Sequence, residues 1–363
     1  AAEPSPVFRK ILRRQGDDGV HTYRIPGLAT TKAGTLLAVF DIRHASAADL
    51  PGDIDVGAMR STDGGVTWSA LCAILDFDKA VPGARGNGVG DPCIVVDRET
   101  GSVFVAALWS RGDRGWAKSG PGLSPDETGQ FVLTRSNDDG LTWSAPINLT
   151  TKVKDPRWRL FFDGPGSGVQ LRDGTLVLPA QFRDAAGTPH SCFIWSADHG
   201  ASWKCSPSAT GGTPPTNEAQ IAELGDGSLL LSMRDTRRGG QRAWACFEWS
   251  GDLAQGRWTK PWNGVPDPTC AAGLVRHPGG VLLFSNPASA TQRMAMTVRA
   301  SRDDGRTWNA GRLIEPGPSA YSCLTVLADG RVGLLYESGG PHACETITFA
   351  AFPLDWVLAA PGR

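Results

Sequence analysis

The chain has 363 residues, with 36 basic and 37 acidic side chains and a net charge of −1. The balanced charge and the lack of a basic stripe argue against a nucleic-acid-binding protein. The longest apolar runs, such as Val103–Trp109, are too short to span a bilayer. Eight cysteines without a CxxC pair and six histidines without ligand spacing predict neither a metal site nor a cofactor. The 45 glycines and 26 prolines between short apolar runs predict many strands joined by tight turns.

Six glycine-containing turns recur along the chain, each between two alternating apolar runs. Their central glycines are Gly34, Gly101, Gly174, Gly227, Gly280 and Gly330. Glycine adopts positive φ at little cost, which suits the connection of a tight hairpin. We interpret each turn as the link between the first two strands of a repeating unit.

A second pattern, Ser-x-Asp-x-Gly-x-(Thr/Ser)-Trp, follows four of these turns. The copies are 61–68, 136–143, 196–203 and 301–308, and a stretched version occupies 250–258. Asp and Gly form the tight turn, and the Trp at a fixed offset supplies an apolar anchor. We interpret these Asp boxes as scaffold that joins the last two strands of a unit, and not as calcium or carbohydrate sites.

Six units of about four strands predict an all-β fold, a six-bladed β-propeller with Asp-box turns. No linker or break in composition divides the chain, so residues 1–363 are expected to form a single domain. The sixth unit ends before a box, and the segment Val7–Arg13 is expected to supply its outer strand and close the ring. A linear β-solenoid is the alternative, but its rungs are shorter and less rich in turns.

Several polar residues lie about one strand length from the glycine turns, and therefore at the opposite rim. They are Arg24, Arg43, Asp91, Glu218, Arg234, Arg293, Tyr321 and Glu337. Because first strands line the axis of a propeller, these side chains are expected to converge in one central cup. Several arginines in a near-neutral protein indicate an anionic ligand, since a guanidinium grips a carboxylate with two hydrogen bonds. A tyrosine in such a cup needs a neighbouring base to act as a nucleophile, and Glu218 is the candidate.

This ordered set resembles the bacterial-type exo-α-sialidases of the six-bladed Asp-box class, over nearly the whole chain. The intervals also fit, with 25 residues from Arg24 to Asp49 and 28 from Arg293 to Tyr321. The matching elements are Tyr23–Pro26, Asp41–Arg43, Asp49, Gly90–Pro92, the four boxes, Asn217–Glu218, Arg234, Arg293, Tyr321 and Leu335–Glu337. A single box is weak evidence, whereas the complete set is specific.

The resemblance implies a retaining hydrolase that removes terminal sialic acids from glycoconjugates. Arg24, Arg234 and Arg293 would hold the C1 carboxylate of the sugar, and Glu337 would fix the fork of Arg24. Sialidases use a tyrosine where most glycosidases use a carboxylate nucleophile. An anionic sugar makes that exchange reasonable, because a phenol avoids the repulsion between two carboxylates.

The resemblance also implies the catalytic roles. Tyr321, deprotonated by Glu218, would attack the anomeric carbon, and Asp49 would protonate the departing oxygen. Arg43 and Asp91 would contact the O4 side of the ring. Two tryptophans are candidates for the pocket of the N-acyl group, and these are Trp109 and Trp116.

Sialylated glycans, glycoproteins or glycolipids are the expected partners of a monomer that binds no nucleic acid. Ala1-Ala2-Glu3 resembles the mature end left by a signal peptidase, which predicts a secreted or periplasmic protein. Cys192 and Cys205 flank one box and can face each other, with pairing left open. One alternative is a non-hydrolytic Asp-box binding propeller, which is expected to lack Tyr321, Glu218 or an arginine. Another is a trans-sialidase or intramolecular trans-sialidase with the same cup.

Overall fold

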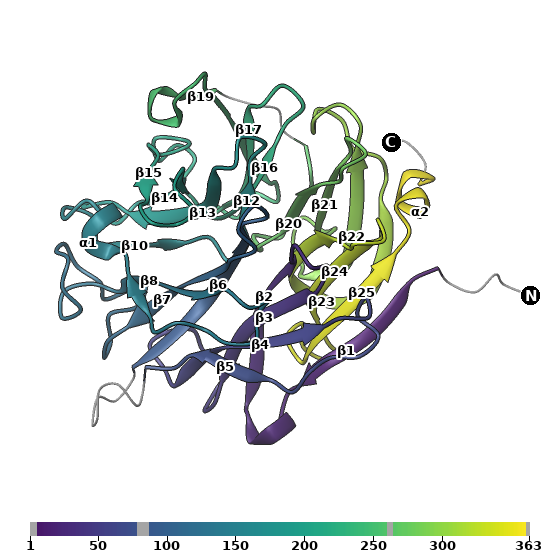
Figure 1. Ribbon diagram of the computed structural model, residues 1–363, viewed down its shortest axis with the longest axis horizontal. Coiled ribbons are helices and arrows are strands. Elements are labelled where there is room, and N and C mark those ends of the chain that lie inside the picture. Colours follow the sequence, from purple (N-terminus) through teal and green to yellow (C-terminus); the bar gives the residue numbers. More distant parts are fainter. Residues whose placement is uncertain (1–5, 78–86, 260–263, 361–363) are drawn as a thin grey trace, which may run out of the picture.

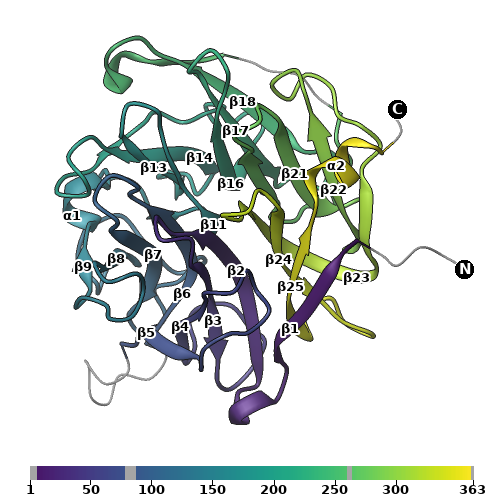
Figure 2. The same cartoon turned by 45° about the vertical axis from the view of Figure 1, so that its right-hand side comes forward.

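The computed structural model describes residues 6–77, 87–259 and 264–360, which are almost entirely β-structure. The only α-helices in these ranges are α1 (Thr150–Val153) and α2 (Leu354–Leu358). The sheets are arranged around a common axis (Figures 1 and 2). No helix among the described residues is long and apolar enough to cross a membrane. Ala1–Glu3, on which the expectation of export rests, lies outside the described residues.

Two of the sheets are simple antiparallel meanders of four strands. The first contains β2 (Thr22–Thr30), β3 (Leu36–Arg43), β4 (Ile54–Ser61) and β5 (Cys72–Leu75). The second contains β16 (Thr216–Glu223), β17 (Leu229–Asp235), β18 (Ala243–Glu248) and β19 (Arg257–Thr259). In both, the strand nearest the axis comes first in the sequence, as the repeat pattern predicts.

Two further sheets share an irregular inner segment. One contains β6 (Gly88–Val96), β7 (Val103–Ser110), β8 (Gln130–Ser136), β9 (Ile147–Asn148) and β11 (Gly166–Ser167). The other contains β10 (Leu160–Asp163), β12 (Val169–Gln170), β13 (Leu176–Arg183), β14 (Pro189–Ser196) and β15 (Lys204–Cys205). The expected inner strand before Gly174 is thus broken, because the sequence Gly-Pro-Gly-Ser-Gly at 164–168 leaves its own sheet. Within it, Gly166 and Ser167 pair with β6 in parallel.

The last sheet has seven strands because one long strand serves two neighbouring sets. Its members are β20 (Gly273–Arg276), β21 (Leu282–Pro287), β22 (Met294–Ser301), β23 (Arg312–Val326), β24 (Val332–Ser338), β25 (Thr346–Phe352) and β1 (Phe8–Arg14). The first half of β23 pairs with β22 and the second half with β24. The N-terminal β1 pairs antiparallel with the C-terminal β25, which confirms the predicted outer strand.

The glycine turns and the boxes have the predicted local structure. All six turn glycines have φ between 82° and 92°. In the first box, Ser61 donates a hydrogen bond to Asp63 (2.8 Å), and Asp63 accepts another from the backbone of Thr67 (2.9 Å). The box carboxylate is therefore used inside its own loop, as the scaffold interpretation requires.

The boxes also attach each set of strands to the preceding one. A Cβ added to Gly65 would lie 2.0 Å from the ring of Phe349, and Trp68 packs edge-on against the same ring. Because Phe349 is on β25, the first box joins the beginning of the chain to its end. Apolar clusters repeat this arrangement between neighbouring sheets, and one of them unites Leu36 and Phe40 with Leu335 and Phe349.

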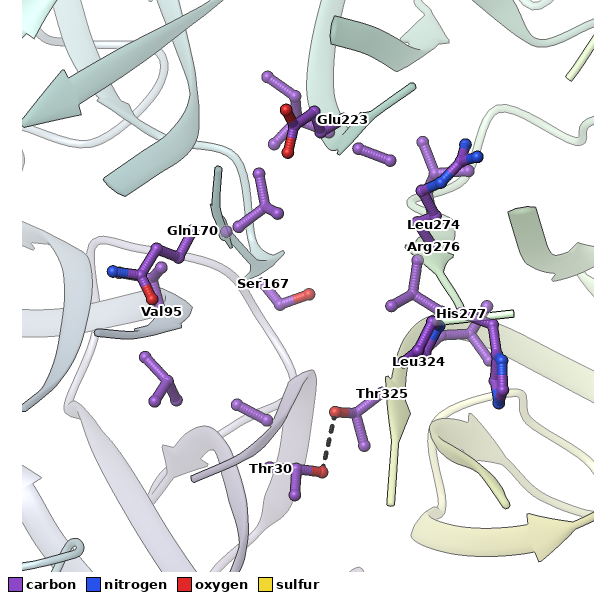
Figure 3. A pocket seen from close by; sticks show the side chains of 18 of the residues that line it. Thr30, Val95, Ser167, Gln170, Glu223, Leu274, Arg276, His277, Leu324 and Thr325 are labelled. Atoms are coloured by element: carbon purple, nitrogen blue, oxygen red, sulfur yellow. Dashed lines mark hydrogen bonds between the residues drawn. The ribbon is translucent and has the colours of Figure 1, made fainter. Parts of the chain in front are cut away.

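A cavity of about 480 Å³ lies on the axis, on the side of the glycine turns (Figure 3). Apolar side chains such as Val95, Leu274 and Leu324 line the cavity. The hydroxyl groups of Thr30 and Thr325 form a hydrogen bond with each other at one wall. None of the predicted site residues lines this cavity. All eight cysteines are free thiols, and Cys205 lies within hydrogen-bonding reach of Cys192.

Candidate active site

The predicted site residues lie at the ends of strands opposite the glycine turns. Four of the inner strands carry an irregularity at that end, between Arg24 and Gly27, Gly90 and Cys93, Asn217 and Ala219, and Ser319 and Ser322. Such bulges bend a strand and redirect side chains. At two of them Ile25 and Asp91 have positive φ (61° and 60°) and precede a proline, which has no N–H for the ladder.

The bulges bring a phenol, a carboxylate and a guanidinium into direct contact. The Tyr321 hydroxyl donates a hydrogen bond to Glu218 Oε1 (2.5 Å). Arg234 Nη1 donates to Glu218 Oε2 (2.6 Å) and to the Tyr321 oxygen (2.9 Å). Burial, and then the charge of Glu218, raise the pKa of Tyr321 well above its usual value, although nearby arginines act in the opposite direction. The phenol therefore keeps its proton and points it at the carboxylate.

Two more arginines flank the same ring. The guanidinium carbon of Arg24 lies 5.2 Å from the centre of the Tyr321 ring, and that of Arg293 lies 5.5 Å from it. Arg293 Nη2 donates to the carbonyl oxygen of Thr269 (3.0 Å). Three cations from different sheets thus surround one phenol, and a guanidinium close to a phenolic oxygen stabilises the phenolate form.

Glu337 holds Arg24 from below. Its fully buried carboxylate accepts hydrogen bonds from Nε (3.1 Å) and Nη2 (3.2 Å) of Arg24. The same carboxylate accepts the backbone N–H groups of Ile25 (2.9 Å) and Tyr321 (3.1 Å). Burial acts to raise the pKa of Glu337, but the charge and hydrogen bonds of Arg24 outweigh it, so that pKa is lowered. Glu337 therefore stays ionised and fixes both an arginine and the strand that carries the tyrosine.

Asp49 lies on the loop between β3 and β4, with 75% of its side chain exposed. Its carboxylate contacts Arg43 Nη1 at 2.8 Å and Arg24 Nη1 at 3.6 Å. Desolvation acts to raise the pKa of Asp49, but Arg43 and then Arg24 outweigh it, so that pKa is lowered. In this structure Asp49 is therefore an ionised carboxylate at the mouth of the cup.

A group of buried carboxyl groups lies beside Arg43. Asp41 accepts two hydrogen bonds from Arg43 (3.1 and 2.9 Å) and one from the backbone of Asp91 (2.8 Å). Burial raises the pKa of Asp41 to about 6 in spite of Arg43, and burial together with Asp41 raises that of Asp91 well above its usual value. Asp163 is fully buried and neither of its carboxyl oxygens has a hydrogen-bond partner. Burial and neighbouring carboxylates also raise the pKa of Asp163 well above its usual value. Asp91 and Asp163 are therefore the carboxyl groups on this side of the cup that favour the protonated form, whereas Asp41 acts as a hydrogen-bond acceptor.

Eight of the nine predicted residues form one connected set of contacts, and Asp91 joins that set through Asp41. The two tryptophans, in contrast, lie apart from each other. Trp109 stacks on Phe77 (4.5 Å) within the core between sheets, so its proposed place in the cup is wrong. Trp116 is 36% exposed and packs edge-on against Phe162 (6.3 Å), with Arg183 over its ring. Phe162 clusters with Leu50, the neighbour of Asp49, which leaves Trp116 as the candidate wall of an apolar pocket.

The sequence-based assignment gave no role to Asp41, Asp163 and Arg242, a fully buried arginine described below. Asp41 and Asp163 each follow a run of large apolar residues inside a strand, which is a signal that sequence inspection can use. A charged residue in such a position is rare unless it has a partner or a function.

Known proteins resemble this chain over most of its length. The BNR repeat-like domain matches residues 34–334. A sialidase of Bacteroides fragilis is 42% identical over 96% of this chain and 65% of its own length. An exo-alpha-sialidase of Arthroderma benhamiae is 30% identical over 95% of this chain and 86% of its own.

Solved structures give the same result. The Hadza microbial sialidase Hz136 superposes with a TM-score of 0.88 at 41% identity, over 96% of this chain and 69% of that one. A leech intramolecular trans-sialidase superposes with a TM-score of 0.82 at 20% identity, over 96% of this chain and 71% of that one, and shows the shared fold. The chain therefore belongs to the sialidase family of BNR-repeat proteins. It spans 65% of the Bacteroides fragilis sialidase and 54% of a 37% identical sialidase of Micromonospora viridifaciens.

Proposed function

We propose that this protein is a retaining exo-α-sialidase that removes terminal sialic acids from glycoconjugates. The observation that carries the proposal is the contact of Tyr321 with Glu218 (2.5 Å) and Arg234 (2.9 Å), between two further arginines. A binding protein has no need of a phenol with a base on its proton. The names of the related proteins support the same activity.

The three arginines would bind the C1 carboxylate of the sugar. Arg24, Arg234 and Arg293 present guanidinium groups from β2, β17 and the segment before β22. Arginine suits this task because its planar fork matches a carboxylate and never loses its charge. The bound carboxylate would lie beside Tyr321, so the neutral phenol avoids repulsion until the attack begins.

The reaction would proceed in two displacements. In the first, the Tyr321 oxygen forms a bond with the anomeric carbon and passes its proton to Glu218. The bond to the glycosidic oxygen breaks, and Asp49 gives that oxygen a proton. In the second, water attacks the anomeric carbon and gives its proton to Asp49, while the phenol leaves and regains its proton from Glu218. Two inversions at one carbon give net retention.

Asp49 must be protonated before it can act as the acid. Its ion pairs with Arg43 and Arg24 lower its pKa in this structure. The substrate carboxylate would compete for Arg24 and would add a negative charge nearby, and both effects raise the pKa of Asp49. We therefore propose that substrate binding itself protonates Asp49, and that the enzyme has an acidic pH optimum.

The decisive experiment is release of 4-methylumbelliferone from its α-sialoside by the wild type, Tyr321→Phe and Tyr336→Phe. Tyr321→Phe is expected to lower kcat by about 10²-fold or more, since nucleophile and proton relay are both lost. Tyr336 is buried on β24 in the core and serves as the matched control, with kcat within about threefold of the wild type. Equal loss in both variants would contradict the proposed role of Tyr321.

Product analysis tests the remaining points. Proton NMR of the first sugar released is expected to show the α-anomer, whereas an inverting enzyme gives the β-anomer. Incubation with sialyllactose and a labelled lactose acceptor separates hydrolysis from transfer and from release of an anhydro sugar. Free sialic acid as the main product supports the hydrolase.

We also infer that the strands form six blades of one domain. The support is that large apolar clusters join neighbouring strand sets, including the first set with the last. The division of the seven-stranded sheet within β23 gives two sets from that sheet. A single cooperative unfolding transition measured by calorimetry is expected for such a closed ring.

A further inference from the structure

Arg242 is a fully buried arginine that does not face the substrate cup. It lies immediately before β18, with 1% of its surface exposed. Its acidic partner is Asp267, with Nη1 3.5 Å from Oδ2, and both side chains are inaccessible to solvent. A buried ion pair is weak evidence for stability, because well-packed apolar residues in its place often do as well. The contacts of the pair indicate another role.

The guanidinium of Arg242 binds three separate parts of the chain. Nε donates to Ser232 Oγ on β17 (2.9 Å). Nη2 donates to the carbonyl oxygen of Glu218 (3.3 Å), and Nη1 donates to the carbonyl oxygen of Cys270 (2.5 Å). One group thus ties the backbone of the proposed base to β17 and to the segment before β20.

The segment around Cys270 carries one side of the proposed carboxylate clamp. Asp267 Oδ1 accepts the backbone N–H of Cys270 (3.1 Å) and so closes a short turn. Inside that turn Thr269 has a φ of 59°, which is unfavourable for a β-branched residue and requires support from its surroundings. The carbonyl oxygen of Thr269 accepts the hydrogen bond from Arg293 Nη2 (3.0 Å). Arg242 and Asp267 therefore determine where this acceptor for Arg293 lies.

We propose that the Arg242–Asp267 pair is a positioning element that fixes the base Glu218 and the clamp residue Arg293 relative to each other. This inference rests on the proposed function and extends it to a pair that does not touch the substrate. Cys270 also clusters with Tyr321, so the same segment forms the floor beneath the nucleophile. Only arginine provides a rigid fork that reaches three acceptors in different directions, and lysine cannot replace it.

The test compares Arg242→Lys with a double variant, Arg242→Met combined with Asp267→Leu. In each, kcat and KM for the 4-methylumbelliferyl sialoside and the thermal midpoint are measured. Arg242→Lys is expected to lower kcat/KM by about 10²-fold, through both a lower kcat and a higher KM, because misplacement of reacting groups by about 1 Å costs that much. Arg60→Lys, at an ion pair with Asp139 outside the cup, is the control and should change kcat/KM less than twofold.

The double variant separates positioning from stability. Removing both charges leaves no unpaired ion, so the thermal midpoint is expected to return to within a few degrees of the wild type. The loss in kcat/KM is expected to persist. Recovery of activity together with stability would overturn the proposal, as would an Arg242→Lys variant with unchanged kcat and KM.

Binding of free sialic acid, measured by calorimetry, keeps this inference distinct from the proposed function. A wild type that binds the sugar without hydrolysing any sialoside would refute the proposed hydrolase. In that case Arg242→Lys is still expected to weaken binding about fivefold or more, because Arg293 loses its support. Unchanged affinity would refute the positioning role.

Discussion

Replacing Glu337 by glutamine should reveal how much the buried Glu337 carboxylate and its contact with Arg24 contribute to the stability of the fold. The carboxylate is fully buried and accepts hydrogen bonds from two nitrogens of Arg24 and two backbone N–H groups. Glutamine keeps the shape of the side chain but removes its charge, and its amide nitrogen places hydrogens opposite the N–H donors of Arg24 or of the backbone. The loss of the charge and the loss of a hydrogen-bond acceptor both destabilise the folded state.

The size of the effect follows from these contacts. Removing one partner of a buried ion pair costs about 3–5 kcal/mol, and the lower end applies because Arg24 retains 11% exposure and the contact with Asp49. A donor left facing an amide N–H₂ adds about 1 kcal/mol. We expect Glu337→Gln to lower the free energy of unfolding by about 4 kcal/mol at pH 7.

The loss should depend on pH in a definite direction. The pKa of Glu337 is lowered in the folded protein, so its ionised form stabilises the fold above the unfolded value of about 4.3. That contribution is lost as the pH falls through the folded pKa. The difference between wild type and variant should therefore shrink by up to about 1 kcal/mol between pH 7 and pH 3.5.

Urea denaturation at the two pH values measures both quantities. Glu248→Gln is the control, because its ion pair with Arg257 is largely exposed (50% and 79%) and should contribute less than about 1 kcal/mol. A loss below about 1 kcal/mol for Glu337→Gln at pH 7, or one that does not change at pH 3.5, would refute the reasoning.

Three further predictions concern single residues. Asp163 is buried without a partner and its pKa is raised by burial and by Asp91, so it stabilises the fold only while protonated. The stability of Asp163→Asn relative to the wild type should therefore increase as the pH rises above about 4, by up to about 1.4 kcal/mol per pH unit. A constant difference between the thermal midpoints of the two proteins from pH 4 to pH 7 would contradict this. Gly65→Ala should lower the free energy of unfolding by about 2–4 kcal/mol, because the added Cβ would meet the ring of Phe349. Gly330 has a similar φ but open space around it, so Gly330→Ala should cost only about 1 kcal/mol. Equal losses of the two variants in urea denaturation would show that the box does not pack tightly against Phe349. Asp49→Ala should lower kcat by about 10²-fold or more for sialyllactose, but much less for the 4-methylumbelliferyl sialoside, whose leaving group needs no proton. The basic limb of the pH profile should also disappear. Similar losses of kcat on both substrates would exclude the role of Asp49 as the acid.

Much of the fold could be predicted because each repeat contains short sequence motifs whose local structure depends on neighbouring residues. The positive φ of Gly34 or Gly330 and the closed turn of the first box depend on neighbours within eight residues. The outer strand from the N-terminus was predictable because the last unit lacked one strand. The third inner strand was not, since the run 164–168 looks like a loop and pairs with β6 across a sheet boundary.

The set of cup residues was also predictable, because equal distances from equivalent turns place side chains at one rim. Their partners were not. Tyr321 and Glu218 lie 103 residues apart, and their 2.5 Å contact depends on bulges in two strands. Trp109 was wrongly expected in the cup, because a strand residue close to the cup can instead direct its ring into the core.

The sequence alone determined the β-repeat, the turns and which charged residues reach one end of the strands, because each of these depends on local spacing. Tertiary structure decided which of those groups are ionised and what holds them. Arg242 gives no local sign that it supports Glu218 and the segment of Thr269, and Asp163 gives none that it lacks a counterion. Protonation and positioning are set by burial and by neighbours distant in the chain, and only the folded arrangement brings those together.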